Sequence, residues 1–290
     1  MNTITKFSKW ILFERYPNFY RPPHKKYISY DTYRSFADHI YDESKTFNPN
    51  NVKKGDIVFL NGRFIDNYLK TQNLKIRNSY SLIICGTGFV IDEMYSKLLL
   101  EKNITHIFSN NLTVERNDLF TFIPFGIKDK RHIFSSNFKR YLNSINSNKK
   151  FILNMDESLV QNQNAILLEK KPVLENKLIN YQSPKNYKNF YEMIRDHKFL
   201  LFSNEINYDF NIIWESIMLN CYPILKLNTF TKALSKIGTP CIFVDEFKEI
   251  EDFDEKFLLN MHNKLKIDSS KTNLLKRNYW KSVIENNLTF

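Results

Sequence analysis

Short apolar runs alternate along this chain with stretches long enough to form helices, and this alternation constrains the fold more than any other feature. The runs in the first half are DIVFLN from Asp56, YSLIICG from Tyr80, HIFSNN from His106 and FTFIPFGI from Phe120. Those in the second half are FILNMD from Phe151, KFLLFS from Lys198, YPILKL from Tyr222 and CIFVDE from Cys241. Runs of this length suit strands buried on both faces, and strands that alternate with helices suit parallel β-α-β units. We therefore predict an α/β protein with parallel sheets.

The polar stretch KRYLNSINSNKK, residues 139–150, is the best candidate for a domain boundary, because it lacks a buried period and precedes a new strand. At 290 residues the chain is long enough for two packed cores. We expect a Rossmann-like lobe over residues 1–145 and a second over residues 146–290, facing each other across a cleft. Two amphipathic helices are predicted at 254–267 and 269–287, and the last either stays with the second lobe or packs back on the first.

Another helix is predicted over residues 31–44, DTYRSFADHIYDES. Its apolar residues recur three and four positions apart: Tyr33, Phe36, Ala37, Ile40 and Tyr41. Asp31 is expected to cap its start, and Arg34 to pair with Asp31 or Asp38 along the helix.

Composition excludes several classes of protein. The apolar share of 42% and aromatic share of 15% are too high for a disordered chain. No apolar stretch is long enough to span a membrane, and Lys6, Lys9 and Glu14 interrupt the N-terminal apolar segment as no secretory signal would allow. We therefore expect a cytoplasmic protein. Each of the three cysteines lies in an apolar run as a buried thiol, and the six histidines have no zinc-type spacing, so no metal site is predicted.

The net charge of +11 favours polyanions, anionic lipid head groups or phosphorylated substrates as partners. Lysines and arginines are dispersed, with no block of five, so binding to nucleic acid is the less favoured alternative. An aromatic and basic N-terminal patch is expected either to rest on an anionic membrane or to be a solvated face. Its residues are Tyr16, Tyr20, Arg21, Lys25 and Lys26.

The stretch from Lys198 to Glu246 carries the strongest functional signal. It predicts a strand, a polar loop, a helix from Asn211 to Leu219 and a second strand after a tight turn. The start of this helix would offer backbone N–H groups to a diphosphate, and Glu215 could accept hydrogen bonds from two ribose hydroxyls. Lys226 could neutralise phosphate charge. Glu215 as a surface carboxylate and Lys226 as an ordinary strand-end lysine are the structural alternatives.

This stretch resembles the signature of exostosin-like glycosyltransferases, which have the GT-B fold. WESIMLNCYPILKL followed by PCIFVDEF is similar to the helix, turn and paired strands of that family. DTYRSFADHIYDE, KGDIVFL and FIPFGI resemble further family segments in the same order, so the likeness extends over most of the chain. It implies transfer of a sugar from a nucleotide-sugar donor to a glycan or lipid-linked saccharide acceptor, with no obligatory metal or other cofactor.

By this resemblance Glu215 matches the glutamate that contacts the nucleotide, and Asn220 stands where relatives have glycine. The residues expected to bind the donor are Glu215, Lys226, Asn211 and Asn204. The loop SNEINYDFNIIWE contains no lysine or arginine, so other segments would have to supply positive charge to the phosphates. The candidates are Lys128, Lys130, Arg131 and Lys185.

In the first lobe, IICGTGFVIDEM lies at a junction between a strand and a helix. A single Gly-x-Gly without a third glycine or a spaced acidic partner does not predict a dinucleotide site. We expect the loop to position the acceptor through Gly86, Thr87 and Gly88, together with Asn110. Asp92 and His106 are the candidate catalytic bases, with Glu93 beside them. His106 as a hydrogen-bonded structural histidine, and Asn110 as a turn cap, are the alternatives.

Two other functions remain open from the sequence. One is a non-catalytic member of the same fold that binds glycans or acts as a scaffold. The other is a basic nucleic-acid-binding protein. A peripheral location at the inner face of the membrane is compatible with the transferase.

Overall fold

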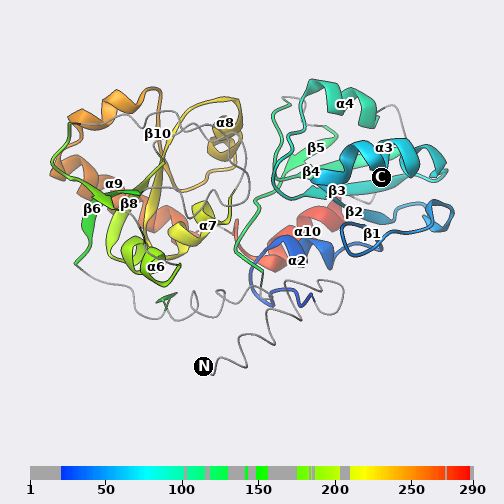
Figure 1. The fold of residues 1–290 in the computed structure, drawn as a ribbon, viewed down its shortest axis with the longest axis horizontal. Helices are drawn as coiled ribbons and strands as arrows, with labels where there is room; N and C mark the ends of the chain where they lie inside the picture. Colours follow the sequence, from blue (N-terminus) through cyan, green and yellow to red (C-terminus); the bar gives the residue numbers. More distant parts are fainter. Residues whose placement is uncertain are drawn as a thin grey trace. The chain divides into compact units, whose positions relative to one another are not determined.

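A computed structural model describes residues 21–100, 103–114, 118–129, 141–142, 148–155, 175–182, 184, 187–202, 210–271 and 273–287. The chain divides into two compact units, each built around a five-stranded parallel sheet (Figure 1). The first unit comprises residues 1–135, 208–211 and 273–290, and the second comprises residues 136–207 and 212–272. The predicted α/β class with two parallel sheets is therefore confirmed. The expected boundary at residues 145 and 146 lies outside the described residues.

The sheet of the first unit follows the order of the chain. Its strands are β1 (His39–Tyr41), β2 (Ile57–Asn61), β3 (Tyr80–Cys85), β4 (Ile104–Ser109) and β5 (Phe120–Phe122), hydrogen-bonded in the order β1-β2-β3-β4-β5. All six residues of β3 are buried, which fits a central strand covered on both faces. The four apolar runs predicted as strands in this half correspond to β2, β3, β4 and β5.

Helices cover both faces of this sheet. Helix α3 (Ile65–Thr71) connects β2 to β3, and α4 (Glu93–Leu100) connects β3 to β4, so right-handed crossovers put both on one face. Helices α2 (Tyr30–Arg34) and α10 (Arg277–Asn286) lie together on the other side in Figure 1. Three short 3-10 turns complete the described elements of the unit: η2 (Pro49–Asn51), η3 (Gly62–Phe64) and η4 (Asn73–Lys75).

The helix predicted over residues 31–44 is wrong beyond its first turn. Helix α2 ends at Arg34, and residues 39–41 form the edge strand β1. The backbone of this segment bonds to β2 instead, because Asp38 N donates to Ile57 O at 2.9 Å and Ile57 N donates to the Asp38 side chain at 2.9 Å. The start also differs, since the Ser29 side chain, not Asp31, accepts from Thr32 N as the cap. Pairing with a neighbouring strand overrides the local helical spacing.

The sheet of the second unit has a different winding. Its strands are β6 (Lys150–Met155), β7 (Ile179–Gln182), β8 (His197–Leu201), β9 (Tyr222–Lys226) and β10 (Ile242–Val244), in the spatial order β10-β9-β8-β6-β7. The chain therefore starts in the sheet at β6, moves to β7 on one side, and then crosses to β8 on the other. This reversal creates a topological switch point between β6 and β8, which is where open α/β sheets bind ligands.

The helices of the second unit are α6 (Tyr187–Arg195), α7 (Asn211–Met218), α8 (Thr229–Lys236) and α9 (Glu255–Lys271), with a 3-10 segment η6 (Phe247–Asp252). The sequence predicts two of these helices, α7 and α9, but not α6 and α8. Helix α9 extends to Lys271, so the last helix begins at Arg277 and not at residue 269 as expected. Trp214 of α7 is buried in the core. Asn220, directly after α7, has φ 54°, so the tight turn predicted after this helix contains a left-handed asparagine.

The C-terminal helix closes the first unit. Ile28 N donates to Leu275 O at 3.0 Å, and Arg277 N donates to Lys26 O at 2.9 Å. Trp280 and Ile284 of α10 are buried, and Trp280 Nε1 donates to Leu274 O at 2.7 Å. The end of the chain is thus part of the same core as the segment around residue 28.

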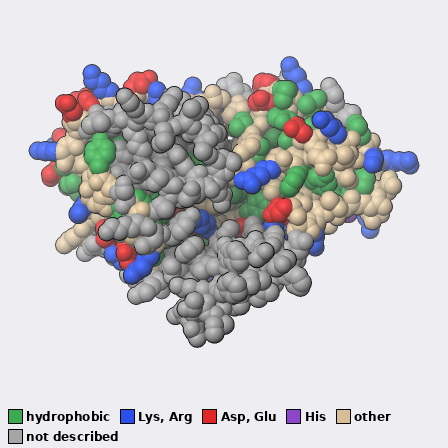
Figure 2. Space-filling model, viewed as in Figure 1, with side chains coloured by type: hydrophobic (Ala, Val, Ile, Leu, Met, Phe, Trp, Pro, Cys, Tyr) green, Lys and Arg blue, Asp and Glu red, His purple; other side chains and the backbone are tan. Residues whose placement is uncertain are grey.

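Both charged and apolar side chains reach the surface of the described residues (Figure 2). Figure 2 shows lysine and arginine side chains distributed over both units, in keeping with their dispersal along the sequence. Apolar side chains also reach the surface, among them Met94 and Leu98 of α4. Within the described part of the chain, no helix combines the length and apolar character needed to cross a bilayer. All three cysteines are buried thiols, as predicted.

Candidate functional site

Polar residues and glycines gather along one edge of the first sheet, at the carboxyl ends of its parallel strands. They are Asp42 and Glu43 after β1, Asn61 and Gly62 at the end of β2, Gly86 to Gly88 after β3, and Asn110 and Asn111 after β4. Because the carboxyl ends of parallel strands share an edge, these residues lie near one another. This edge is the candidate site of the first unit.

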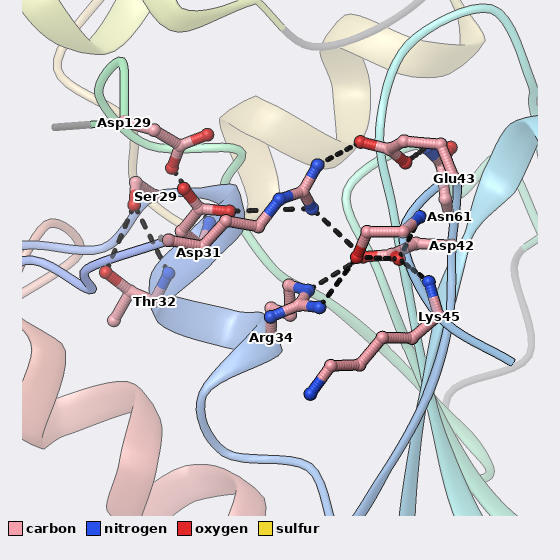
Figure 3. A network of polar contacts seen from close by, with 11 residues as sticks. Ser29, Asp31, Thr32, Arg34, Asp42, Glu43, Lys45, Asn61 and Asp129 are labelled. Atoms are coloured by element: carbon pink, nitrogen blue, oxygen red, sulfur yellow. Dashed lines mark hydrogen bonds and ion pairs between the residues drawn. The ribbon is translucent and has the colours of Figure 1, made fainter. Parts of the chain in front are cut away.

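Asp42 is the centre of an ion-pair network at this edge (Figure 3). Its Oδ2 accepts from Arg21 Nη1 at 2.9 Å and from Arg34 Nε at 2.7 Å. Its Oδ1 accepts from Ser44 Oγ at 2.6 Å, and from the backbone N–H groups of Ser44 and Lys45. Burial alone would raise the pKa of Asp42, but the bonds from Ser44 and Arg34 outweigh it and hold the pKa below its usual value.

Among the carboxylates that pair with Arg21, Glu43 is the one that reaches solvent, with 35% of its side chain exposed. One carboxylate oxygen is bonded to Arg21, and the other accepts from Asn61 Nδ2 at 2.9 Å. Burial raises the pKa of Glu43, whereas the charge of Arg21 and the bond from Asn61 lower it to a net value below normal. The Glu43 carboxylate is thus held in place by Arg21 and Asn61, and its lowered pKa makes it a weak general base.

Two expectations about arginines change with this network. Arg21 was expected in an exposed N-terminal patch, but only 3% of its side chain is exposed and it bonds to Asp42 and Glu43. Its pKa lies above the ordinary value, because the surrounding carboxylates outweigh the opposing effect of burial. Arg34 pairs with Asp42 rather than along a helix with Asp31 or Asp38, because the helix ends at Arg34. Tyr16 and Tyr20 lie outside the described residues.

The predicted acceptor loop is shaped by two buried asparagines. Asn110 accepts from Gly86 N at 3.1 Å, and Asn110 and Asn111 both donate to Gly86 O at 3.0 Å. Gly86 and Gly88 have φ of 142° and 78°, conformations that favour glycine. Both polar atoms of the Asn110 amide are thus bonded to the backbone of Gly86. Thr87, the next residue of the loop, is half-exposed and lies beside Arg63.

The structure does not bring the two candidate bases together. Asp92 is exposed at the start of α4, where its Oδ1 accepts from Tyr95 N at 3.0 Å as a helix cap. His106 lies near the amino end of β4, away from the strand end that carries Asn110. Its Nε2 is 2.8 Å from Thr121 Oγ1, and burial lowers its pKa. Its surroundings are those of the hydrogen-bonded structural histidine named as the alternative.

In the second unit, the candidate site is the switch point at the carboxyl ends of β6 and β8. Helix α7 begins at Asn211, ten residues after the end of β8 at Leu201. The α7 N–H groups and the positive end of its dipole suit a phosphate at this edge. Asn204 lies outside the described residues, as do Lys130, Arg131 and Lys185.

Glu215 lies inside the second unit and is directed at a neighbouring helix. Its carboxylate accepts from the Tyr191 hydroxyl of α6 at 2.7 Å, and only 1% of the residue is exposed. Tyr191 in turn stacks on Tyr141, with ring centroids 5.9 Å apart. Contact between Glu215 and a ribose stays a prediction. It would require the hydrogen bond from Tyr191 to Glu215 to break so that a ribose hydroxyl could donate to the carboxylate instead.

The remaining predicted donor contacts have protein partners of their own. Lys226, at the carboxyl end of β9, forms an ion pair with Glu246 at 3.0 Å. Asn211 donates from its side chain to Gly126 O at 2.8 Å, both residues belonging to the first unit. The backbone carbonyl of Lys128 accepts a hydrogen bond from His24 Nε2 at 2.9 Å.

Lys149 is a buried cation that the sequence analysis did not single out. Its Nζ donates to the carbonyls of Leu219 at 2.5 Å, Asn220 at 2.9 Å and His197 at 3.1 Å. It therefore satisfies the carbonyls at the end of α7, opposite to the end that faces the switch point. Burial lowers the pKa of Lys149 to about 8. The only hint in the sequence is a lysine directly before a buried strand.

Within the described ranges, no group of three or more His, Cys, Asp or Glu side chains could hold a metal ion. The sequence does not predict the network around Asp42, because Arg34 and Asp42 lie in a segment whose spacing predicts a single helix, whereas α2 ends at Arg34 and β1 follows. No protein-family model matches this chain, and a search of curated proteins found no relative.

Proposed function

We propose that this chain is a glycosyltransferase of the GT-B type, which moves a sugar from a nucleotide-sugar to a glycan or lipid-linked saccharide. The switch point between β6 and β8, with α7 starting beside it, is the observation that carries the proposal. The order of segments that resembles exostosin-like transferases supports it independently.

The proposed donor site uses the carboxyl edge of the second sheet. The nucleotide diphosphate would lie at the α7 N-terminus, whose N–H groups stabilise the charge that builds on the leaving phosphate. Lys226 is the last residue of the neighbouring strand β9. It would add a cation to this edge by leaving its ion pair with Glu246 and pairing with the phosphate. Glu215 would bind the ribose by exchanging its bond from Tyr191.

The proposed acceptor site uses the carboxyl edge of the first sheet. Glu43 is held ionised by Arg21 and Asn61 and is partly exposed, so it suits a sugar hydroxyl as a hydrogen-bond acceptor. The half-exposed Thr87 offers a second polar group at the same edge. Asp92 keeps its proposed role as a base because it is exposed, whereas the buried His106 is the weaker candidate.

A thermal-shift screen against nucleotides and nucleotide-sugars tests the donor site. A ligand at about a hundred times its dissociation constant stabilises the folded state by about 2.7 kcal/mol, which raises the melting temperature by about 5 °C. The nucleoside without phosphate and inorganic phosphate alone serve as controls. Absence of a shift with every nucleotide, in folded protein, would contradict the proposal.

Glu215→Gln sharpens this test, because the amide oxygen still accepts from Tyr191 while the charge is lost. We expect nucleotide affinity to fall about tenfold if the carboxylate binds the ribose. Glu192→Gln on α6, whose side chain is partly exposed, is the matched control and should leave affinity unchanged. Equal affinity for both variants would remove Glu215 from the donor site.

A non-catalytic glycan-binding protein is the second candidate. The burial of Glu215 against Tyr191 favours it, because a carboxylate engaged in the core is not free to take a ligand. Glycan binding without nucleotide binding or sugar transfer would support this candidate over the first.

A further inference from the structure

Two basic segments from opposite ends of the chain lie side by side in the first unit. Tyr27 and Lys276 form an antiparallel bridge, flanked by the bonds from Ile28 N to Leu275 O and from Arg277 N to Lys26 O. These bonds bring the sequence KKY, residues 25–27, next to KRNYWK, residues 276–281. The resulting group, here called the basic patch, consists of Lys25, Lys26, Lys276 and Arg277.

Three members of the basic patch are free to meet a partner in solution. Lys25, Lys26 and Lys276 are exposed. Arg277 is partly buried, with its guanidinium carbon 5.6 Å from the centre of the Phe36 ring. The exposed charges of the patch are therefore mainly lysine ammonium groups. These act as mobile point charges, unlike the planar guanidinium of an arginine, which binds an anion through two hydrogen bonds.

The position of these cations opposes the usual rule for helix ends. Lys276 is the N-cap residue of α10 and Arg277 is its first residue, and the first turn of this described helix contains no acidic residue. Cations at the positive end of a helix dipole are unfavourable. Helices α4 and α9 have an acidic residue in the first turn, Glu93 and Glu255, whereas α6, α7 and α8 have none. Lys276 and Arg277 therefore add their charges to the positive end of the α10 dipole.

We propose that the basic patch binds the anionic surface of a membrane. The positive end of α10 and the lysines from both segments would face the phosphate groups of the lipid heads together. Tyr279 follows on the same helix with 40% of its surface exposed, and such a ring suits the headgroup layer. Direct attachment through charges alone is reversible and depends on salt. This proposal does not depend on the transferase function.

Vesicle co-sedimentation tests the proposal with the full chain. We expect binding to vesicles of phosphatidylcholine and phosphatidylglycerol in equal parts, weakened by salt, and none to phosphatidylcholine alone. Each lysine near such a surface changes affinity about fivefold, so Lys25→Gln/Lys26→Gln/Lys276→Gln should bind about a hundredfold more weakly. Lys53→Gln/Lys54→Gln/Lys75→Gln removes the same charge from exposed positions elsewhere in the first unit and is the matched control.

Several results would overturn the proposal. One is failure of the wild-type protein to bind the anionic vesicles, and another is an equal loss of binding in the two triple variants. Binding to double-stranded DNA or RNA that depends on the patch, with no binding to vesicles, would assign the surface to nucleic acid instead. Circular dichroism of the triple variants checks folding, and the single variant Lys26→Gln replaces the triple if that one unfolds.

Discussion

At the scale of single residues, the buried charges of this protein are handled in two ways. Asp42 has two arginines and several N–H and O–H donors around it, so its ionised form is favoured despite burial. Lys149 has only neutral carbonyls as hydrogen-bond acceptors among the contacts described above, and burial pulls its pKa down to about 8. Asp42 therefore stays ionised, whereas Lys149 can lose its charge near physiological pH.

The buried lysine predicts a pH dependence of stability in alkaline solution. Above pH 8 the folded chain releases the Lys149 proton, whereas the unfolded chain keeps it up to about 10.5. The unfolded state then binds more protons, so the contribution of Lys149 to the free energy of unfolding rises with pH, by up to about 3 kcal/mol. Urea unfolding of the wild type and Lys149→Met across this range measures it.

The difference between the two proteins isolates Lys149, because tyrosines and other lysines titrate in both. We expect the wild type to gain stability relative to Lys149→Met as the pH rises from about 8 to about 10.5. Parallel curves for the two proteins would mean that the lysine is solvated and keeps its normal pKa. At pH 7 the variant also reports what the three carbonyl contacts contribute.

At the scale of elements, the turn from α7 to β9 shows how a helix is stopped at a defined residue. Cys221 N donates to Ser216 O at 2.9 Å, and Asn220 N donates to Ile217 O at 3.0 Å. Asn220 takes a left-handed conformation that lets both bonds form. The same turn presents the carbonyls that Lys149 binds, so one residue conformation and one buried cation together set where α7 ends.

Substitution of Asn220 tests this account. Glycine has no Cβ penalty at φ 54°, so we expect Asn220→Gly to stabilise the second unit by up to about 1 kcal/mol. Asn220→Ala should destabilise it by about 1 kcal/mol, since alanine lacks the tolerance of asparagine for this conformation. Thermal or urea unfolding measures both. A more stable alanine variant would show that the turn does not need a left-handed residue.

At the scale of the whole molecule, the chain leaves the first unit, builds the second and returns to the first with its last helix. Residues 273–290 belong to the first unit, and α10 contributes the buried side chains of Trp280 and Ile284. The first unit therefore cannot complete its core until the last residues of the chain are present. The second unit, in contrast, forms its sheet from strands that all lie between residues 150 and 244.

Removal of residues 273–290 should consequently affect the two units differently. Loss of buried Trp280 and Ile284 costs several kcal/mol, of the order of 3–5 kcal/mol for the tryptophan alone, which is comparable to the stability of a small domain. We expect amide hydrogen exchange to accelerate throughout β1 to β5 and to stay slow in β8 and β9. Restoration by an added peptide of residues 273–290 is the control. Equal acceleration in both sheets would contradict the division into units.

The sequence determined the strands that are buried on both faces, because a continuous apolar run predicts such a strand without knowledge of what packs against it. It also determined α7 and the tight turn that follows it. It missed the edge strands β1 and β7, which are short and partly exposed, and it extended a helix through β1. The candidate site was predicted in part: the Gly86 loop and the start of α7 fall at strand ends, as expected. His106 lies near the amino end of its strand, as the run HIFSNN predicts, and so at the end of β4 opposite to Asn110.

Only the tertiary structure decided which polar side chains meet. Arg21, Asp42 and Glu43 come together because strand pairing ends β1 beside the arginine, and no periodicity in the sequence encodes that contact. The same holds for Glu215 against Tyr191 and for the meeting of Lys26 with Arg277. Apolar burial depends on the pattern of each segment by itself, whereas a hydrogen bond depends on the positions of two groups that only the folded chain brings within reach.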